Sequence, residues 1–118
     1  MIHSAHASRY HWNLAGDVVN YLRGDWQIAH VYTLLKLPER ALHYALLCLR
    51  QCEDHQIDDF DRAFAYEGVA RGWACQGNLV EADKFYRLAE AAGYQIAEAE
   101  DRDLFFDDLR KPPWYGLK

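Results

Sequence analysis

Apolar residues recur along most of this 118-residue chain at the three- and four-residue spacing of an amphipathic helix. No segment shows the sustained alternation of apolar and polar residues that marks a half-buried β-strand. Glycines, prolines and short polar stretches divide the pattern into segments. The pattern therefore predicts an all-α chain of five or six helices, with a further short segment over Asp17–Arg23. The six are Ser4–Leu14, Trp26–Leu35, Pro38–Cys52, Phe60–Gln76, Leu79–Ala92 and Ala97–Lys111.

Several helix ends carry recognisable signals. Gly24 separates the short segment from the next helix, and Asp25 is placed to cap that helix. Gly77 fits a left-handed residue after a helix carboxyl end. Asn78 is followed three residues later by Glu81, which resembles a capping box. We therefore expect a tight turn between Phe60–Gln76 and Leu79–Ala92.

The end of the sequence is unusually apolar. A Pro-Pro pair stops the last predicted helix, and Trp114-Tyr115-Gly116-Leu117 follows it. Two adjacent aromatic residues are atypical of a solvated tail. We expect this segment to dock on the body of the protein or on a second copy, which would make a two-fold homodimer.

Small and aromatic residues occupy particular helical positions between Tyr66 and Gly93. Small residues let the two predicted helices approach closely, and aromatic residues fill the remaining space. The residues that carry the pattern are Ala70, Trp73, Ala82, Tyr86 and Ala89. This helical hairpin resembles a tetratricopeptide repeat.

A weaker copy of the hairpin occurs 41 residues earlier in the chain, since Ala41 takes the place that Ala82 has in the second hairpin. Ala29, Tyr32, Ala41 and Cys48 then match the small and large positions of the second unit. The spacing exceeds the roughly 34 residues of a tetratricopeptide unit. The resemblance implies a short right-handed superhelix of two such hairpins in a single domain, residues 1–118, with capping helices at both ends.

The resemblance also implies a binding surface, because the first helix of each tetratricopeptide hairpin lines a concave groove for peptides. Carried over to this sequence, the groove would use the amino-terminal helix, Trp26–Leu35 and Phe60–Gln76. The expected partner-binding residues are Tyr10, Trp26, His30, Thr33, Glu67 and Arg71. Tyr10 and Trp26 would supply apolar anchors, and Arg71 would meet a carboxylate of the partner.

Helical spacing independently places Glu67 and Arg71 four residues apart, on a face that Ala70 and Trp73 do not use. One reading is a groove with an aromatic floor, one carboxylate and one cation. The other is an ordinary surface ion pair that contributes little to stability.

Composition narrows the function classes. The net charge of −5 argues against sequence-independent binding of nucleic acid, which relies on neutralising phosphates. No run of about 18 apolar residues predicts a membrane span, and the first residues lack the apolar core of a signal peptide. We therefore expect a cytoplasmic protein whose three cysteines are reduced, small core residues.

Signals for chemistry are weak. The sequence lacks HExxH, GxSxG and phosphate-binding glycine motifs, so no cofactor, metal site or catalytic residue is expected. His3 and His6 have helical spacing, but no further ligand completes a zinc site in sequence.

The expected function is thus a non-catalytic adaptor that binds a protein or peptide. The alternative is a small enzyme or metal-dependent protein that uses His6, His11, His30 and Glu67. An open groove would favour the adaptor, and a deep cavity with converging His and Glu side chains would favour chemistry.

Overall fold

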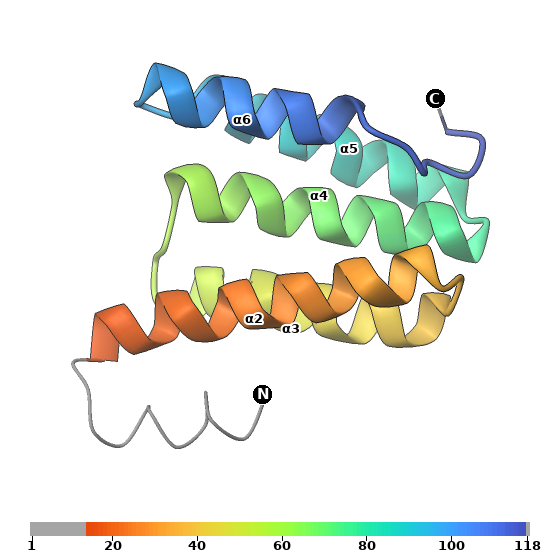
Figure 1. Ribbon diagram of the computed structural model, residues 1–118, viewed down its shortest axis with the longest axis horizontal. Helices are drawn as coiled ribbons and strands as arrows, with labels where there is room; N and C mark the ends of the chain where they lie inside the picture. The colour runs from red at the N-terminus through yellow and green to blue at the C-terminus, as the bar shows by residue number, and fades with distance from the viewer. Residues whose placement is uncertain (1–13, 118) are drawn as a thin grey trace.

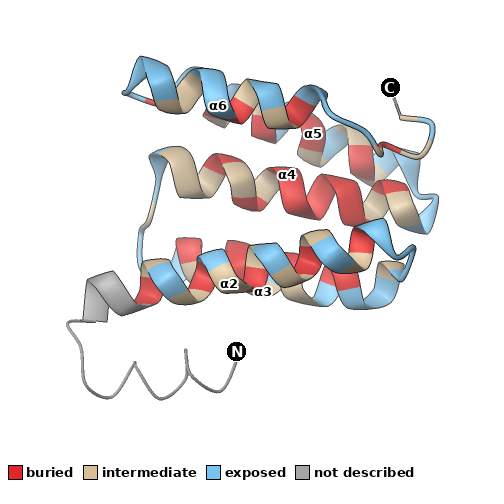
Figure 2. Ribbon diagram, in the orientation of Figure 1, coloured by how far each residue is buried: buried red, intermediate tan, exposed pale blue. Residues whose placement is uncertain are grey.

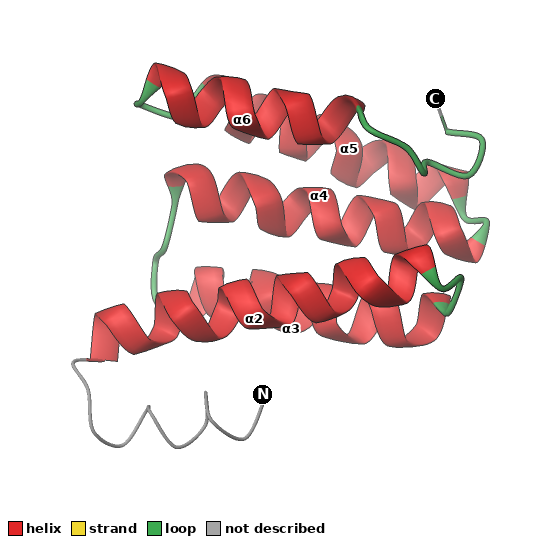
Figure 3. Cartoon of the chain, in the orientation of Figure 1, coloured by secondary structure: helices red, strands yellow, loops and turns green. Residues whose placement is uncertain are grey.

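The computed structural model of the chain describes residues 14–117. Within this range it contains five helices and no strand, which confirms the predicted all-α class for this part (Figure 3). The helices are α2 (Leu14–Leu34), α3 (Pro38–Asp54), α4 (Asp59–Gln76), α5 (Leu79–Tyr94) and α6 (Ala99–Arg110). The predicted amino-terminal helix, apart from its last residue, lies outside the described residues, as do Tyr10, His6 and His11.

Helix α4 is the centre of the fold and packs against each of the other four helices. In Figure 1, α2 and α6 lie towards the viewer, and α3 and α5 lie behind them. Among the described helices, α2 and α6 do not pack on each other. The two helices therefore stand on either side of α4 on one face of the molecule.

The sequence of α4 explains its central place. Small residues allow neighbours to approach on several sides, and most of the helix is buried (Figure 2). At Gly68, for example, an added Cβ would lie 3.2 Å from the Trp26 side chain. The buried part of α4 consists of Ala63, Ala65, Glu67, Gly68, Val69, Ala70, Arg71, Gly72 and Ala74.

Helix α2 corrects the prediction of two separate helices. It runs without interruption from Leu14 to Leu34, and Gly24 lies inside it. Asp25 is buried and accepts a hydrogen bond from Gln51 on α3 at 3.3 Å, so it does not cap a helix. A mid-helix glycine costs roughly 1 kcal/mol, and burial of apolar residues such as Leu22 and Ala29 outweighs that cost.

Gly93 was predicted to lie beyond the end of a helix, but α5 continues to Tyr94. Gly93 is buried, and an added Cβ would lie 2.5 Å from the Phe105 ring of α6. Tertiary packing, rather than helix termination, therefore explains this glycine. Helix α6 is also shorter than the predicted Ala97–Lys111.

The turn between α4 and α5 matches the sequence signals. Gly77 is left-handed, with φ of 91°, and directly follows α4. The side chain of Asn78 accepts a hydrogen bond from the backbone N–H of Glu81 at 3.1 Å. Ala70 and Ala82 are fully buried in one apolar cluster, as their small size predicts.

The segment that follows α6 docks on the body of the protein, which is one of the two arrangements expected from sequence; the other was docking on a second copy. Trp114 is 5% exposed and belongs to the apolar cluster formed with α4, α5 and α6. Its ring packs at 5.0 Å from that of Tyr86, and its Nε1–H donates to the carbonyl of Leu109. None of the described helices is long and apolar enough to cross a membrane.

Candidate functional site

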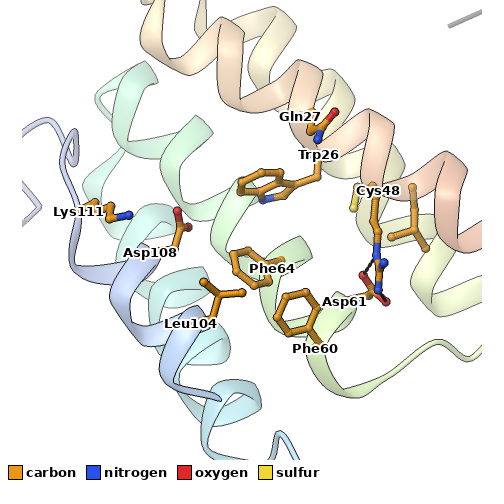
Figure 4. A pocket seen from close by; sticks show the side chains of 11 residues that line it. Trp26, Gln27, Cys48, Phe60, Asp61, Phe64, Leu104, Asp108 and Lys111 are labelled. Atoms are coloured by element: carbon orange, nitrogen blue, oxygen red, sulfur yellow. Dashed lines mark hydrogen bonds and ion pairs between the residues drawn. The ribbon is translucent and has the colours of Figure 1, made fainter. Parts of the chain in front are cut away.

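A half-open pocket of about 320 Å³ lies between α2 and α6, with α4 as its floor (Figure 4). Its volume is at the lower end of the range for small-ligand and anchor-residue pockets. The residues that line it come mainly from these three helices: Leu22, Arg23, Trp26, Gln27, Cys48, Phe60, Asp61, Phe64, Leu104, Asp108 and Lys111. We call this the interhelix pocket.

Aromatic rings form the walls of the interhelix pocket. Phe64 of α4 meets Trp26 edge-on at 5.4 Å and Phe60 at 4.7 Å between ring centroids. Leu104 of α6 faces the rings from the opposite side and is 56% exposed (Figure 4). An exposed leucine beside three aromatic rings provides a surface for an apolar group of a ligand.

Charged side chains lie at the two ends of the pocket. At one end, Arg23 donates two hydrogen bonds to Asp61, at 2.8 and 3.1 Å. At the other end, Asp108 and Lys111 approach the pocket from α6 and the residue after it (Figure 4). The pocket is therefore amphipathic, with an apolar middle and polar ends.

Beneath the pocket lies a buried ion pair between Glu67 and Arg71. These side chains are 0% and 2% exposed, so they do not form the open groove surface expected from sequence. Arg71 Nε donates to Glu67 Oε2, and Trp26 Nε1 donates to Glu67 Oε1 at 2.8 Å. Helix α6 and the residues after it cover this face of α4, which helical spacing within α4 alone does not reveal.

The rest of the Arg71 guanidinium holds the end of the chain. Nη2 donates to the carbonyl of Asp108 at 2.7 Å, and Nη1 donates to those of Lys111 at 2.9 Å and Pro113 at 3.0 Å. The guanidinium also lies 4.2 Å from the centroid of the Trp114 ring. Arg71 is thus used by protein groups and fixes the position of the pocket residues Asp108 and Lys111.

The carboxyl group of Glu67 has an unusual environment. Its pKa is raised to about 8: burial is the main cause, the charge and hydrogen bonding of Asp108 act in the same direction, and Arg71 opposes the shift. Oδ2 of Asp108 is buried and accepts no recorded hydrogen bond. A protonated Glu67 carries a donor, and Asp108 is the neighbouring side chain that favours this protonated form.

The other predicted groove residues on α2 have different environments. His30 stacks on Trp26 at 5.2 Å, and burial lowers its pKa, with Arg71 acting in the same direction and Asp108 against it. It therefore lies on the same side of α4 as Arg71. Thr33 is buried: its hydroxyl donates to Ala29, and its carbonyl accepts from the hydroxyl of Tyr115. Of the predicted residues described, Trp26 is the one that lines the pocket.

Metal ligands and cysteines offer little further chemistry. In the range 14–117, no group of three His, Cys, Asp or Glu side chains is close enough to hold a metal ion. Cys48 and Cys52 are buried in the core formed with α2 and α4, as expected for small core residues. Cys48 also contributes to the base of the interhelix pocket.

Sequence reasoning missed most of the pocket. Phe60 and Phe64 are four residues apart on α4, a spacing that could have marked them as neighbours on one face. Leu104 of α6 also lines the pocket, and the sequence did not single it out as a site residue. The approach of α6 to α2 across α4 has no signal in the local sequence pattern.

The arrangement can hold an apolar side chain or small group between aromatic walls, with polar contacts at either end. Glu67 contacts one of these walls, Trp26, and also Arg71, but it does not line the pocket. The chain matches no protein-family model, and comparisons with curated proteins and with solved structures find no significant match.

Proposed function

We propose that this protein is a non-catalytic adaptor that binds a protein or peptide segment through the interhelix pocket. In this proposal α2–α3 and α4–α5 are two tetratricopeptide-like hairpins of a short right-handed superhelix, and α6 caps the stack. The first helix of each hairpin and α6 line the same pocket, which supports this view. The proposal keeps the groove expected from sequence but moves its contact residues from Arg71 to the aromatic walls.

One observation carries the proposal: the pocket is half open and aromatic, whereas the charged groups beneath it are engaged within the protein. Binding energy in protein interfaces concentrates in a few aromatic and apolar anchors that fill such pockets. Trp26, Phe60 and Phe64 supply rigid walls, and Leu104 is exposed before any partner binds. An apolar anchor residue of a partner would cover these side chains.

The enzyme alternative has one observation in its favour, the pKa of Glu67 near 8, because general acids and bases need shifted pKa values. Glu67 is 0% exposed and does not line the interhelix pocket, and His30 does not line it either. A ligand in the pocket would meet Trp26 and Phe64 before reaching Glu67. The geometry therefore favours binding over catalysis.

Peptides selected from a random display library against the wild-type chain test the proposal. Replacing Leu104 by Arg places a charge on the pocket wall and should weaken binding of the selected peptides at least about tenfold. Leu88→Arg is the matched control, because Leu88 is 38% exposed on α5 and does not line the pocket. Titration of labelled peptides by fluorescence anisotropy measures both.

Equal affinity of the two variants would contradict the proposed site. Thermal unfolding of both variants should match that of the wild-type chain, because both side chains are already exposed. A selective loss with Leu104→Arg in a folded protein would place the partner between α2 and α6.

A further inference from the structure

We propose that residues 111–117, which we call the C-terminal segment, already occupy one half of the partner groove. A partner segment with prolines followed by an aromatic residue would bind there by displacing them. This inference rests on the proposed function and adds the chemical class of the partner. It is carried by the way in which the C-terminal segment is held.

The C-terminal segment is bound to α4 through its backbone carbonyls. Arg71 Nη1 donates to the carbonyls of both Lys111 and Pro113. The recorded backbone hydrogen bonds of the segment are local, from Lys111 N–H to Asp108 and from Leu117 N–H to Trp114. Side chains of the body therefore hold the segment, rather than a shared backbone ladder.

Two aromatic side chains of the segment anchor it. Trp114 fills a site between the guanidinium of Arg71, at 4.2 Å, and the ring of Tyr86, at 5.0 Å. Tyr115 reaches across to α2 and donates its hydroxyl to the carbonyl of Thr33. Such buried aromatic anchors are the usual energetic centres of peptide recognition.

The chemistry of the site fits prolines. The body of the protein presents the N–H donors of Arg71 to the backbone carbonyls of the segment. The body also presents an acceptor, the Thr33 carbonyl, and the Tyr115 hydroxyl donates to it. A proline has a carbonyl acceptor but no backbone N–H, so it leaves no donor unpaired in such a site.

The site of the C-terminal segment adjoins the interhelix pocket. Asp108 and Lys111 line the pocket with their side chains, and their carbonyls bind Arg71. Both sites lie along α4: Phe60 and Phe64 are in its first half, and Arg71 is in its second half. A partner segment in place of residues 111–117 could therefore place a neighbouring residue in the pocket.

The test uses the full chain and a fluorescein-labelled peptide with the sequence of residues 110–117. In the wild-type chain the attached segment competes at an effective concentration of about millimolar, so the peptide should bind weakly. Trp114→Ala removes the anchor of the attached segment, and we expect this chain to bind the peptide at least about tenfold more tightly. Tyr94→Ala, which removes an exposed aromatic residue of α5, should leave affinity unchanged.

A second peptide with Ala in place of Trp114 should bind the Trp114→Ala chain at least about tenfold more weakly. Circular dichroism and a cooperative melt establish that the variant is folded. If it is not folded, the Tyr115→Phe chain is used to bind the labelled peptide in its place. This substitution removes only the hydroxyl that donates to the Thr33 carbonyl. That chain should bind the peptide several-fold more tightly than the wild-type chain.

Absence of tighter binding by the folded variant, or equal binding of the Trp and Ala peptides, would overturn the inference. The proposed function is judged separately by the Leu104→Arg and Leu88→Arg pair with library-selected peptides. Selective loss there, with no binding of the tail peptide, would leave the adaptor proposal standing and remove only the displacement of the C-terminal segment.

Discussion

The two halves of the groove along α4 differ in what fills them. Around Phe60 and Phe64 the space between α2 and α6 is open, and Leu104 remains 56% exposed. Around Arg71 the corresponding space is occupied by residues that follow α6, and the guanidinium is 2% exposed. One half is an apolar pocket, and the other is a satisfied polar core.

The difference teaches which features of a helix face are available for binding. Charged residues in the closed half looked like a binding surface in sequence, but their hydrogen bonds are already made within the protein. Phe60 and Phe64 in the open half were not singled out in sequence, but with Trp26 they line a half-open pocket. While residues 111–117 are docked, the polar pair contributes to structure, whereas the aromatic walls can contribute to affinity.

Loss of Arg71 should have the largest effect on stability. Arg71→Met leaves Glu67 and three backbone carbonyls without their donor in a buried site, and we expect a loss of about 3–5 kcal/mol in the free energy of unfolding. Urea denaturation measures it. Arg87→Met, which breaks an exposed pair with Asp83, should leave the midpoint unchanged. Equal effects of the two variants would refute the structural role of Arg71.

Trp114→Ala should have the next largest effect. It removes a buried ring that packs on Tyr86 and Arg71, and we expect a loss of about 3 kcal/mol. Hydrogen exchange should show faster opening of residues 111–117 and of α6, with less change in α2 and α3. Uniform exchange across all helices would contradict a locally docked segment.

The raised pKa of Glu67 predicts a pH dependence of stability that arises in the closed half. Glu67 has a pKa of about 8 when folded against a reference value of 4.5, so the folded state binds more protons between these values. Its contribution to stability therefore falls as pH rises from about 4.5 to 8, and is constant below and above. Glu67→Gln should remove this slope.

At one pKa unit per roughly 1.4 kcal/mol, the wild-type chain should lose about 2–3 kcal/mol relative to Glu67→Gln between pH 4.5 and 7. Urea denaturation at a series of pH values measures the difference. Parallel pH profiles of the two proteins would show that Glu67 titrates normally.

The open half should tolerate substitution better. Phe60 is only partly buried, so Phe60→Ala should cost about 1 kcal/mol, less than Trp114→Ala in the same chain. The same substitution should cost more in the binding free energy of library-selected peptides than in the free energy of unfolding. A loss of stability as large as that of Trp114→Ala would mean that the pocket wall is core.

Local signals in the sequence located several parts of the fold. The turn at Gly77 and Asn78 and the close packing of Ala70 and Ala82 follow from backbone conformation, capping and side-chain size. The same reasoning failed at Gly24 and Gly93, where tertiary contacts outweighed the preference of glycine to end a helix. Glycine inside a helix is ambiguous until its neighbours are known.

The residues of the candidate site could be predicted from the sequence only in part. Trp26 was predicted and lines the pocket, whereas Tyr10 lies outside the described residues. Leu104 of α6 and Lys111, the residue after α6, are 40 or more positions away from Phe60 and Phe64 in the sequence, and no periodicity links such positions.

The sequence by itself determined the all-α class of the described residues and most helix boundaries, because helix periodicity and capping are local properties. Its apolar character predicted that the Trp114 segment docks, but left open whether it does so on the body or on a second copy. Tertiary structure alone decided which face of α4 is closed. The pairing of Glu67 with Arg71 is a local i to i+4 relation, but its burial depends on α6 and the C-terminal segment. Whether a charged pair is a surface feature or a core depends on what folds over it, which only the packing of distant segments decides.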